Sequence, residues 1–272
     1  CAPAPQGAPR PPWETVGRAA PPQDAPERSG DVGGCVWALS RTPQGCRRVQ
    51  QALDDARGPE ACGRLAAELR GHVWDALRCP HANFVLQKCI TTASPDACQF
   101  IVDELLQRGH GALAQAARHR YGCRIVERLL ERCRPEQVEQ IVDCILDDAV
   151  TLCMHPYGNY VAQHLLEHAA PERRDRLAKV LVAHVGTLGT DCYALAVLGR
   201  ALSGGPRAAE LARAVLAEEG LLASMARTRQ GQLASKLAVQ AIEDPGQRGA
   251  ARRRLAAEAA QLRAPTGQRA AL

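Results

Sequence analysis

The sequence predicts an all-α protein, an α-solenoid of about six three-helix repeats. A short polar pattern recurs with its first residue at positions 46, 83, 123 and 159, and the register continues at Leu195 and Gln232. The repeat length is therefore close to 37 residues. From about Val36 onward the chain reads as amphipathic helices broken by short polar turns, without strand-like alternation. Such a period is typical of solenoids, in which each repeat buries its apolar face only against its neighbours.

Composition agrees with this fold class. The 272 residues are 46% hydrophobic and 3% aromatic, so small aliphatic side chains must fill the core. The net charge is +5 and comes almost wholly from arginine, which suits phosphate contacts and stacking on bases. This charge permits a nucleic-acid partner without requiring one. No apolar run approaches the roughly 20 residues of a membrane span, and no signal peptide is visible.

The chain divides into three parts. Residues 1–32 are rich in Pro, Ala, Gln and Arg and are expected to form a disordered or extended leader. Residues 33–264 are expected to form the repeat domain, with four intact repeats to about 183 and two degenerate repeats over 184–264. Residues 265–272 are expected to be a flexible tail.

The fourth repeat illustrates the elements of each unit. A short helix over 149–154 is followed by a turn at 155–158 and a second helix over 159–167. A third helix is expected over 173–183, after a break at Pro171. Similar prolines at 59, 95 and 135 predict a helix start, because proline suits the first turn. Three extra residues between the second and third repeats predict a longer connection near 107–111. The last helix, about 247–262, carries Arg252–Arg254 and is expected to be a solvated closing face.

A polar triplet stands at positions i, i+1 and i+4 of the second helix in the first four repeats. Positions i and i+4 share one helix face, while i+1 lies about 100° around the axis. Two side chains can therefore hold the edge of a base while the third stacks on its face. The twelve predicted site residues are Cys46, Arg47, Gln50, Asn83, Phe84, Gln87, Cys123, Arg124, Glu127, Asn159, Tyr160 and Gln163.

These residues resemble Pumilio repeats. The resemblance is carried by Tyr121-Gly122-Cys123-Arg124-Ile125-Val126-Glu127 and by His155-Pro156-Tyr157-Gly158-Asn159-Tyr160-Val161-Ala162-Gln163, and it extends over roughly residues 33–263. It implies a right-handed crescent whose concave face binds single-stranded RNA, with two or three side chains recognising each base. It also implies that the RNA runs antiparallel to the protein.

The chemistry of the triplets, together with the family resemblance, predicts a base order. Glu127 accepts hydrogen bonds only, so it matches the two adjacent donors of guanine. A Gln amide suits uracil or adenine. The pairing of Asn at i with Gln at i+4 resembles the family's triplet for uracil, and the pairing of Cys with Gln resembles its triplet for adenine. In the family a Glu at i+4 usually pairs with a Ser at i, so Cys123 departs from the pattern. From the fourth repeat back to the first, the order is 5′-UGUA-3′.

The family resemblance also implies a setting. Classical members bind 3′ untranslated regions of messenger RNAs in the cytoplasm and lower translation or stability by recruiting other proteins. We therefore expect a monomeric messenger-RNA-binding protein with possible corepressors on its convex face and no membrane partner. Either the chain is a fragment of a domain with more N-terminal repeats, or it binds a short site.

The fifth and sixth repeats lack recognisable triplets. They carry Leu195-Ala196-Val197-Leu198-Gly199 and Gln232-Leu233-Ala234-Ser235-Lys236 in the same register. Leu195 and Gly199 have no side-chain group that bonds a base. These repeats are expected to be structural caps, with backbone contact through Lys236 as the alternative.

Two other functions remain open. A HEAT- or armadillo-like scaffold for proteins explains the helices but not the triplets. A nucleolar Pumilio-like protein of ribosome biogenesis, with broader RNA binding, fits the eroded last repeats.

An enzyme is not expected, and neither a cofactor nor a metal site is. The histidines recur mainly at turns or at repeat-equivalent positions, which favours structural roles. The twelve cysteines form no C-x-x-C pair, and several lie within helices, so reduced thiols acting as small hydrophobic groups are favoured over disulfides.

Overall fold

The computed structural model of the chain describes residues 32–263. The expected leader, apart from residue 32, and the expected tail lie outside the described residues. Within the described part the chain is helical and contains no β-strand.

Between residues 32 and 263 the α-helices fall into six consecutive sets of three, which confirms the predicted α-solenoid. The first repeat contains α1 (Val36–Ser40), α2 (Pro43–Asp55) and α3 (Pro59–Ala67). The second contains α4 (Val73–Arg78), α5 (Ala82–Thr92) and α6 (Gln99–Gln107), which the 3-10 helix η1 (Asp96–Cys98) precedes. The third contains α7 (His110–Arg118), α8 (Gly122–Arg132) and α9 (Glu139–Asp147). The fourth repeat contains α10 (Ala149–Cys153), α11 (Gly158–His168) and α12 (Pro171–Ala183). The fifth contains α13 (Val185–Leu188), α14 (Ala194–Leu202) and α15 (Ala208–Ala217). The sixth contains α16 (Leu221–Arg227), α17 (Gly231–Ala241) and α18 (Pro245–Arg263).

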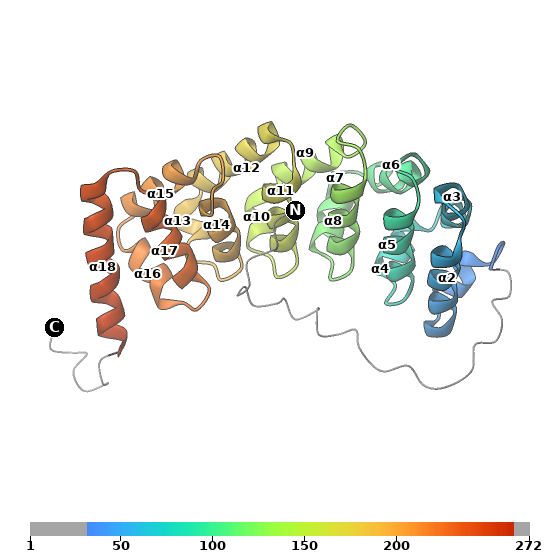
Figure 1. Ribbon diagram of the computed structural model, residues 1–272, viewed down its shortest axis with the longest axis horizontal. Coiled ribbons are helices and arrows are strands. Elements are labelled where there is room, and N and C mark those ends of the chain that lie inside the picture. The colour runs from blue at the N-terminus through green and yellow to red at the C-terminus, as the bar shows by residue number, and fades with distance from the viewer. Residues whose placement is uncertain (1–31, 264–272) are drawn as a thin grey trace. The chain divides into compact units, whose positions relative to one another are not determined.

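The second helices of all six repeats form one continuous row. Each of α2, α5, α8, α11, α14 and α17 packs against the next in that order (Figure 1). The core runs along this row: Val161 and Leu165 of α11, for example, are almost fully buried, as the helical periodicity predicts. Side chains at one position of successive second helices therefore lie in register from repeat to repeat.

Two predicted details of the helices are wrong. The extra residues before the third repeat do not lengthen a connection. They extend its first helix, because α7 has nine residues where α4 has six. Pro95 and Pro135 also do not begin α-helices, unlike Pro59 and Pro171. Pro95 leads into η1, and Pro135 lies in a turn in which the Gln137 side chain accepts from the Arg134 N–H at 2.9 Å.

The cysteines that the structure describes, Cys35 to Cys192, are free thiols. Most are buried; burial raises the pKa of Cys153 in α10 to about 12, so its thiol stays protonated. The buried cysteines therefore act as small core side chains. Among the described helices, none has both the length and the apolar character needed to span a bilayer.

Candidate nucleic-acid interface

The second helix of every repeat begins with the same capping arrangement. A side chain four residues before position i accepts a hydrogen bond from the backbone N–H at i−1, and this satisfies one of the N–H groups that a helix start leaves unpaired. The six capping residues are Thr42, Cys79, His119, His155, Asp191 and Thr228. The caps fix where each helix starts and therefore the register of each triplet.

Two of these caps are histidines in their neutral form. Nδ1 of His119 and of His155 accepts the N–H of the following glycine, Gly122 or Gly158, at 3.2 Å in each case. An imidazolium has no free acceptor, so protonation removes the cap. Burial lowers the pKa of both rings, and neighbouring arginines lower it further.

We expect the repeat domain to lose stability between pH 7.5 and pH 5.5 in part through these two caps. Folding lowers the pKa of both histidines. The two caps therefore contribute fully to the free energy of unfolding above the unfolded-state pKa of about 6.5, and this contribution is lost as the pH falls toward the folded-state pKa. Thermal unfolding at the two pH values measures the loss. The double variant His119→Thr/His155→Thr, which copies the caps of the first and sixth repeats, should show a smaller loss. An identical pH dependence in both proteins would contradict this role.

In three of the four triplets the residues at i and i+4 are bonded to each other. The amide Nε2 of Gln87 donates to Asn83 Oδ1, and that of Gln163 donates to Asn159 Oδ1, both at 3.0 Å. In the first repeat Gln50 Nε2 donates to Cys46 Sγ, also at 3.0 Å. Each bond orients the glutamine amide, and in the two Asn–Gln pairs the amide keeps its oxygen and one N–H for another partner.

The residue at i is buried, and the sequence alone did not predict this. A side chain that holds the edge of a base is expected to be accessible, but Asn159 is only 4% exposed and Asn83 only 1%. Asn159 Nδ2 donates to the backbone carbonyls of His155 and Pro156 at 2.8 and 3.0 Å. The half-buried glutamine at i+4 is therefore the more accessible polar group of these triplets.

The third repeat differs because a carboxylate cannot donate to its neighbour. Glu127 is 6% exposed; its Oε2 accepts from Arg124 Nη1 at 2.6 Å, while its Oε1 is buried without a hydrogen-bond partner. Burial raises the pKa of Glu127, and Arg124 opposes the rise. Cys123, at position i, donates instead to the Arg120 carbonyl. This repeat therefore holds a buried acceptor that needs a donor.

The residues at i+1 carry flat side chains on the accessible side of the row. Phe84 is 51% exposed, Arg47 is exposed, and Arg124 and Tyr160 are half-buried. The Arg124 guanidinium lies over the Tyr160 ring, 4.9 Å from its centroid. Two consecutive i+1 side chains are thus already stacked on each other between the third and fourth repeats.

The fifth and sixth repeats keep the caps but lack the paired side chains. On α14, Leu195 is 1% exposed, Gly199 is buried and Ala196 is exposed. On α17, Gln232 and Lys236 are exposed, and Leu233 presents a largely bare apolar side chain at i+1. The structure thus places all twelve predicted site residues on α2, α5, α8 and α11 and adds no equivalent pair on the two remaining second helices.

The fold and this site define an α-solenoid repeat protein with a continuous row of second helices, of which the first four each carry one polar triplet. A model of the Pumilio-family RNA binding repeat matches residues 79–106, 114–146 and 148–182. The chain is 31% identical over 114 residues to a Pumilio domain-containing protein of Schizosaccharomyces pombe, and 27% identical over 104 residues to a pumilio homologue of Arabidopsis thaliana. These alignments cover 42% and 38% of this chain but only 16% of each relative.

Solved structures show the same fold. The crystal structure of PUF-8 in complex with PBE-RNA superposes with a TM-score of 0.72 at 24% identity, covering 84% of this chain and 66% of that one. The structure of the Puf3 RNA binding domain bound to a Cox17 RNA 3′ UTR recognition sequence superposes with a TM-score of 0.72 at 22% identity, covering 88% of this chain and 74% of that one. The resemblance predicted from the sequence is therefore confirmed: the chain carries Pumilio-family repeats, and the matches fall on its second, third and fourth repeats.

Proposed function

We propose that this protein binds single-stranded RNA sequence-specifically and recognises 5′-UGUA-3′ with α11, α8, α5 and α2 in that order. The unsatisfied Oε1 of Glu127 is the observation that carries the proposal. An unpaired buried acceptor costs free energy unless a ligand supplies a donor. Guanine supplies two adjacent donors, N1–H and N2–H, that a carboxylate accepts together.

Binding guanine requires Arg124 to move. A base between Arg124 and Tyr160 needs about 7 Å, twice the usual contact distance, and the two groups are 4.9 Å apart in the free protein. As Arg124 leaves Glu127 Oε2, guanine takes both carboxylate oxygens. The guanidinium then stacks on the base face.

The uracil assignments rest on the two Asn–Gln pairs. Because the asparagine holds one glutamine N–H, the amide presents an acceptor and one donor side by side. Uracil's N3–H and an adjacent carbonyl complement this pattern. In the first repeat the weak acceptor Cys46 replaces the asparagine, which supports a different base there, and we assign adenine by the family pattern.

The related structures support an RNA ligand and a cellular role of the same kind. PUF-8 and Puf3 were solved with RNA, and the Puf3 ligand comes from a 3′ untranslated region. By analogy we propose that this protein acts as a monomer in the cytoplasm. It would bind 3′ untranslated regions of messenger RNAs for repression or decay, with corepressors on the face opposite the RNA. The role is binding and not catalysis.

Fluorescence anisotropy with short labelled RNAs tests the proposal. We expect UGUA-containing RNA to bind more tightly than RNA with adenine in place of the guanine, by about 1–3 kcal/mol or roughly fivefold to 150-fold. A permuted RNA of the same composition is the control for charge and length. Equal binding of all three RNAs would contradict the UGUA assignment and would favour a broad binder of the ribosome-biogenesis type. No binding to any RNA would favour the protein-binding scaffold.

A further inference from the structure

The C-terminal half of α11 carries a group of side chains that the triplets do not use. His164, Glu167 and His168 form an H-x-x-E-H sequence, and their potential ligand atoms all lie within 4.8 Å of one another. The two imidazoles, four residues apart on one helix face, have ring centroids 4.3 Å apart. Two histidines at i and i+4 of a helix are a known arrangement for zinc.

His164 is the most buried member and is not satisfied by the protein. Its side chain is 12% exposed, and Nε2 is buried without a hydrogen bond, although Glu131 Oε1 of α8 lies 3.4 Å away. This buried nitrogen is therefore open to a ligand from outside the protein.

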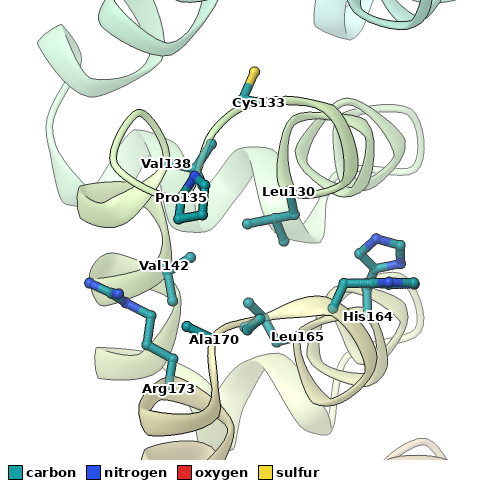
Figure 2. A pocket seen from close by; sticks show the side chains of 11 residues that line it. Leu130, Cys133, Pro135, Val138, Val142, His164, Leu165, Ala170 and Arg173 are labelled. Carbon is teal, nitrogen blue, oxygen red and sulfur yellow. The ribbon is translucent and has the colours of Figure 1, made fainter. Parts of the chain in front are cut away.

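A small cavity adjoins the two histidines. His164 and His168 line a cavity of about 50 Å³ between the third and fourth repeats, in which His164 lies at the edge away from Arg173 (Figure 2). Two arginines beside the cluster form ion pairs, Arg128 with Glu131 and Arg200 with the proposed ligand Glu167. Arg173, which also lines the cavity, is paired with Glu139 of α9.

We propose that His164, Glu167 and His168 bind a divalent transition-metal ion, zinc by ligand type. Two nitrogens and a carboxylate oxygen are ordinary zinc ligands, and solvent would supply the fourth position. Tetrahedral coordination needs ligand atoms about 3.4 Å apart, and the half-exposed His168 and Glu167 can close that distance by rotation. Glu167 would exchange its exposed pair with Arg200, a type of contact that contributes little.

This site departs from the expectation drawn from the sequence, which assigned structural roles to the histidines. It is independent of RNA recognition, because none of its three ligands belongs to a triplet. Its consequence would be local, since a bound ion stabilises the folded state only and so raises the thermal midpoint.

Cobalt(II) and zinc titrations of the whole chain test the proposal. We expect cobalt to give tetrahedral absorption bands without thiolate charge transfer, and excess zinc to raise the melting temperature. His168→Gln should weaken cobalt binding at least tenfold and abolish the zinc shift. Glu167→Gln should weaken binding less. His110→Gln, at an exposed histidine that begins α7, is the matched control and should behave as wild type.

Three results would overturn the site. These are unchanged cobalt affinity in His168→Gln, a thiolate charge-transfer band that identifies cysteines as the ligands, and no binding of either ion at tens of micromolar. Circular dichroism of each variant shows that it is folded. RNA affinity measured on the same samples should not change, so failure of this site and failure of RNA recognition are distinguishable.

Discussion

Replacing Glu127 by glutamine is expected to exchange guanine for adenine at the second position of the RNA. The substitution makes the third triplet Cys, Arg, Gln, which is the triplet of the first repeat. The new amide has an N–H to donate to Cys123 Sγ, as Gln50 donates to Cys46 at 3.0 Å. UGUA should then bind more weakly by about 1–3 kcal/mol, and UAUA should become the preferred ligand.

The same change is not expected to unfold the protein. It removes a buried carboxylate whose pKa is raised by burial and whose Oε1 has no partner. A neutral amide of nearly the same shape avoids that desolvation cost, so the melting temperature should hold or rise. Loss of RNA binding together with loss of structure would therefore contradict the energetic interpretation as well as the base assignment.

The reciprocal variant Gln50→Glu is the matched control. It gives the first repeat the triplet of the third and should change the preferred fourth base from adenine to guanine, so that UGUG binds best. The double variant should prefer UAUG. Anisotropy titrations of the four proteins against the four RNAs measure all of these shifts. Unchanged affinities for UGUA and UAUA in Glu127→Gln would show that α8 does not recognise the second base.

The fold was predictable because repeats bury their faces only against copies of themselves. A period near 37 residues therefore specified three helices per unit and a continuous row of second helices. The helix caps were not predictable as a set, since Thr42, Cys79, His119 and Asp191 share a hydrogen-bond acceptor and no residue type. Their equivalence appears only when the backbone donor at i−1 is seen.

The positions of the triplets on the second helices were also predictable. Which residue of each triplet is buried and which is accessible was not. Helical periodicity places Asn83 and Gln87 on one face without saying how closely the next repeat covers each of them. Packing buries the asparagine and turns it into a support for the glutamine. The Arg124–Glu127 contact joins residues three apart, i+1 and i+4, instead of the i and i+4 residues paired by the sequence pattern. It forms because the Glu127 carboxylate has no hydrogen to donate to Cys123 and instead accepts a hydrogen bond from the nearby Arg124 guanidinium.

Installing a triplet in the fifth repeat is expected to extend the recognised sequence by one uracil at its 5′ end. The variant Leu195→Asn/Ala196→Tyr/Gly199→Gln copies Asn159, Tyr160 and Gln163 of α11 onto α14. A Cβ at position 199 would meet only Ala234, at 3.8 Å, which is ordinary contact. An asparagine at 195 can donate to the Asp191 carbonyl, just as Asn159 donates to that of His155.

This triple substitution is expected to lower folding stability and to raise RNA affinity, and the two effects are measured separately. Replacing the buried Leu195 should lower the free energy of unfolding by about 2–3 kcal/mol, part of which the new hydrogen bonds recover. UUGUA should gain affinity over AUGUA by about 1–3 kcal/mol, whereas the wild-type protein, with no polar pair on α14, should not distinguish the two RNAs. The single variant Ala196→Tyr separates stacking from edge recognition, because it should strengthen both RNAs equally.

The graft also tests the direction of the RNA. If the triple variant is folded and prefers AUGUU instead of UUGUA, the strand runs parallel to the protein and the base order must be reversed. If it prefers neither, α14 does not face the RNA and the fifth repeat is a structural cap. A gain confined to UUGUA requires the antiparallel strand and requires the row of second helices to present its triplets to RNA beyond α11.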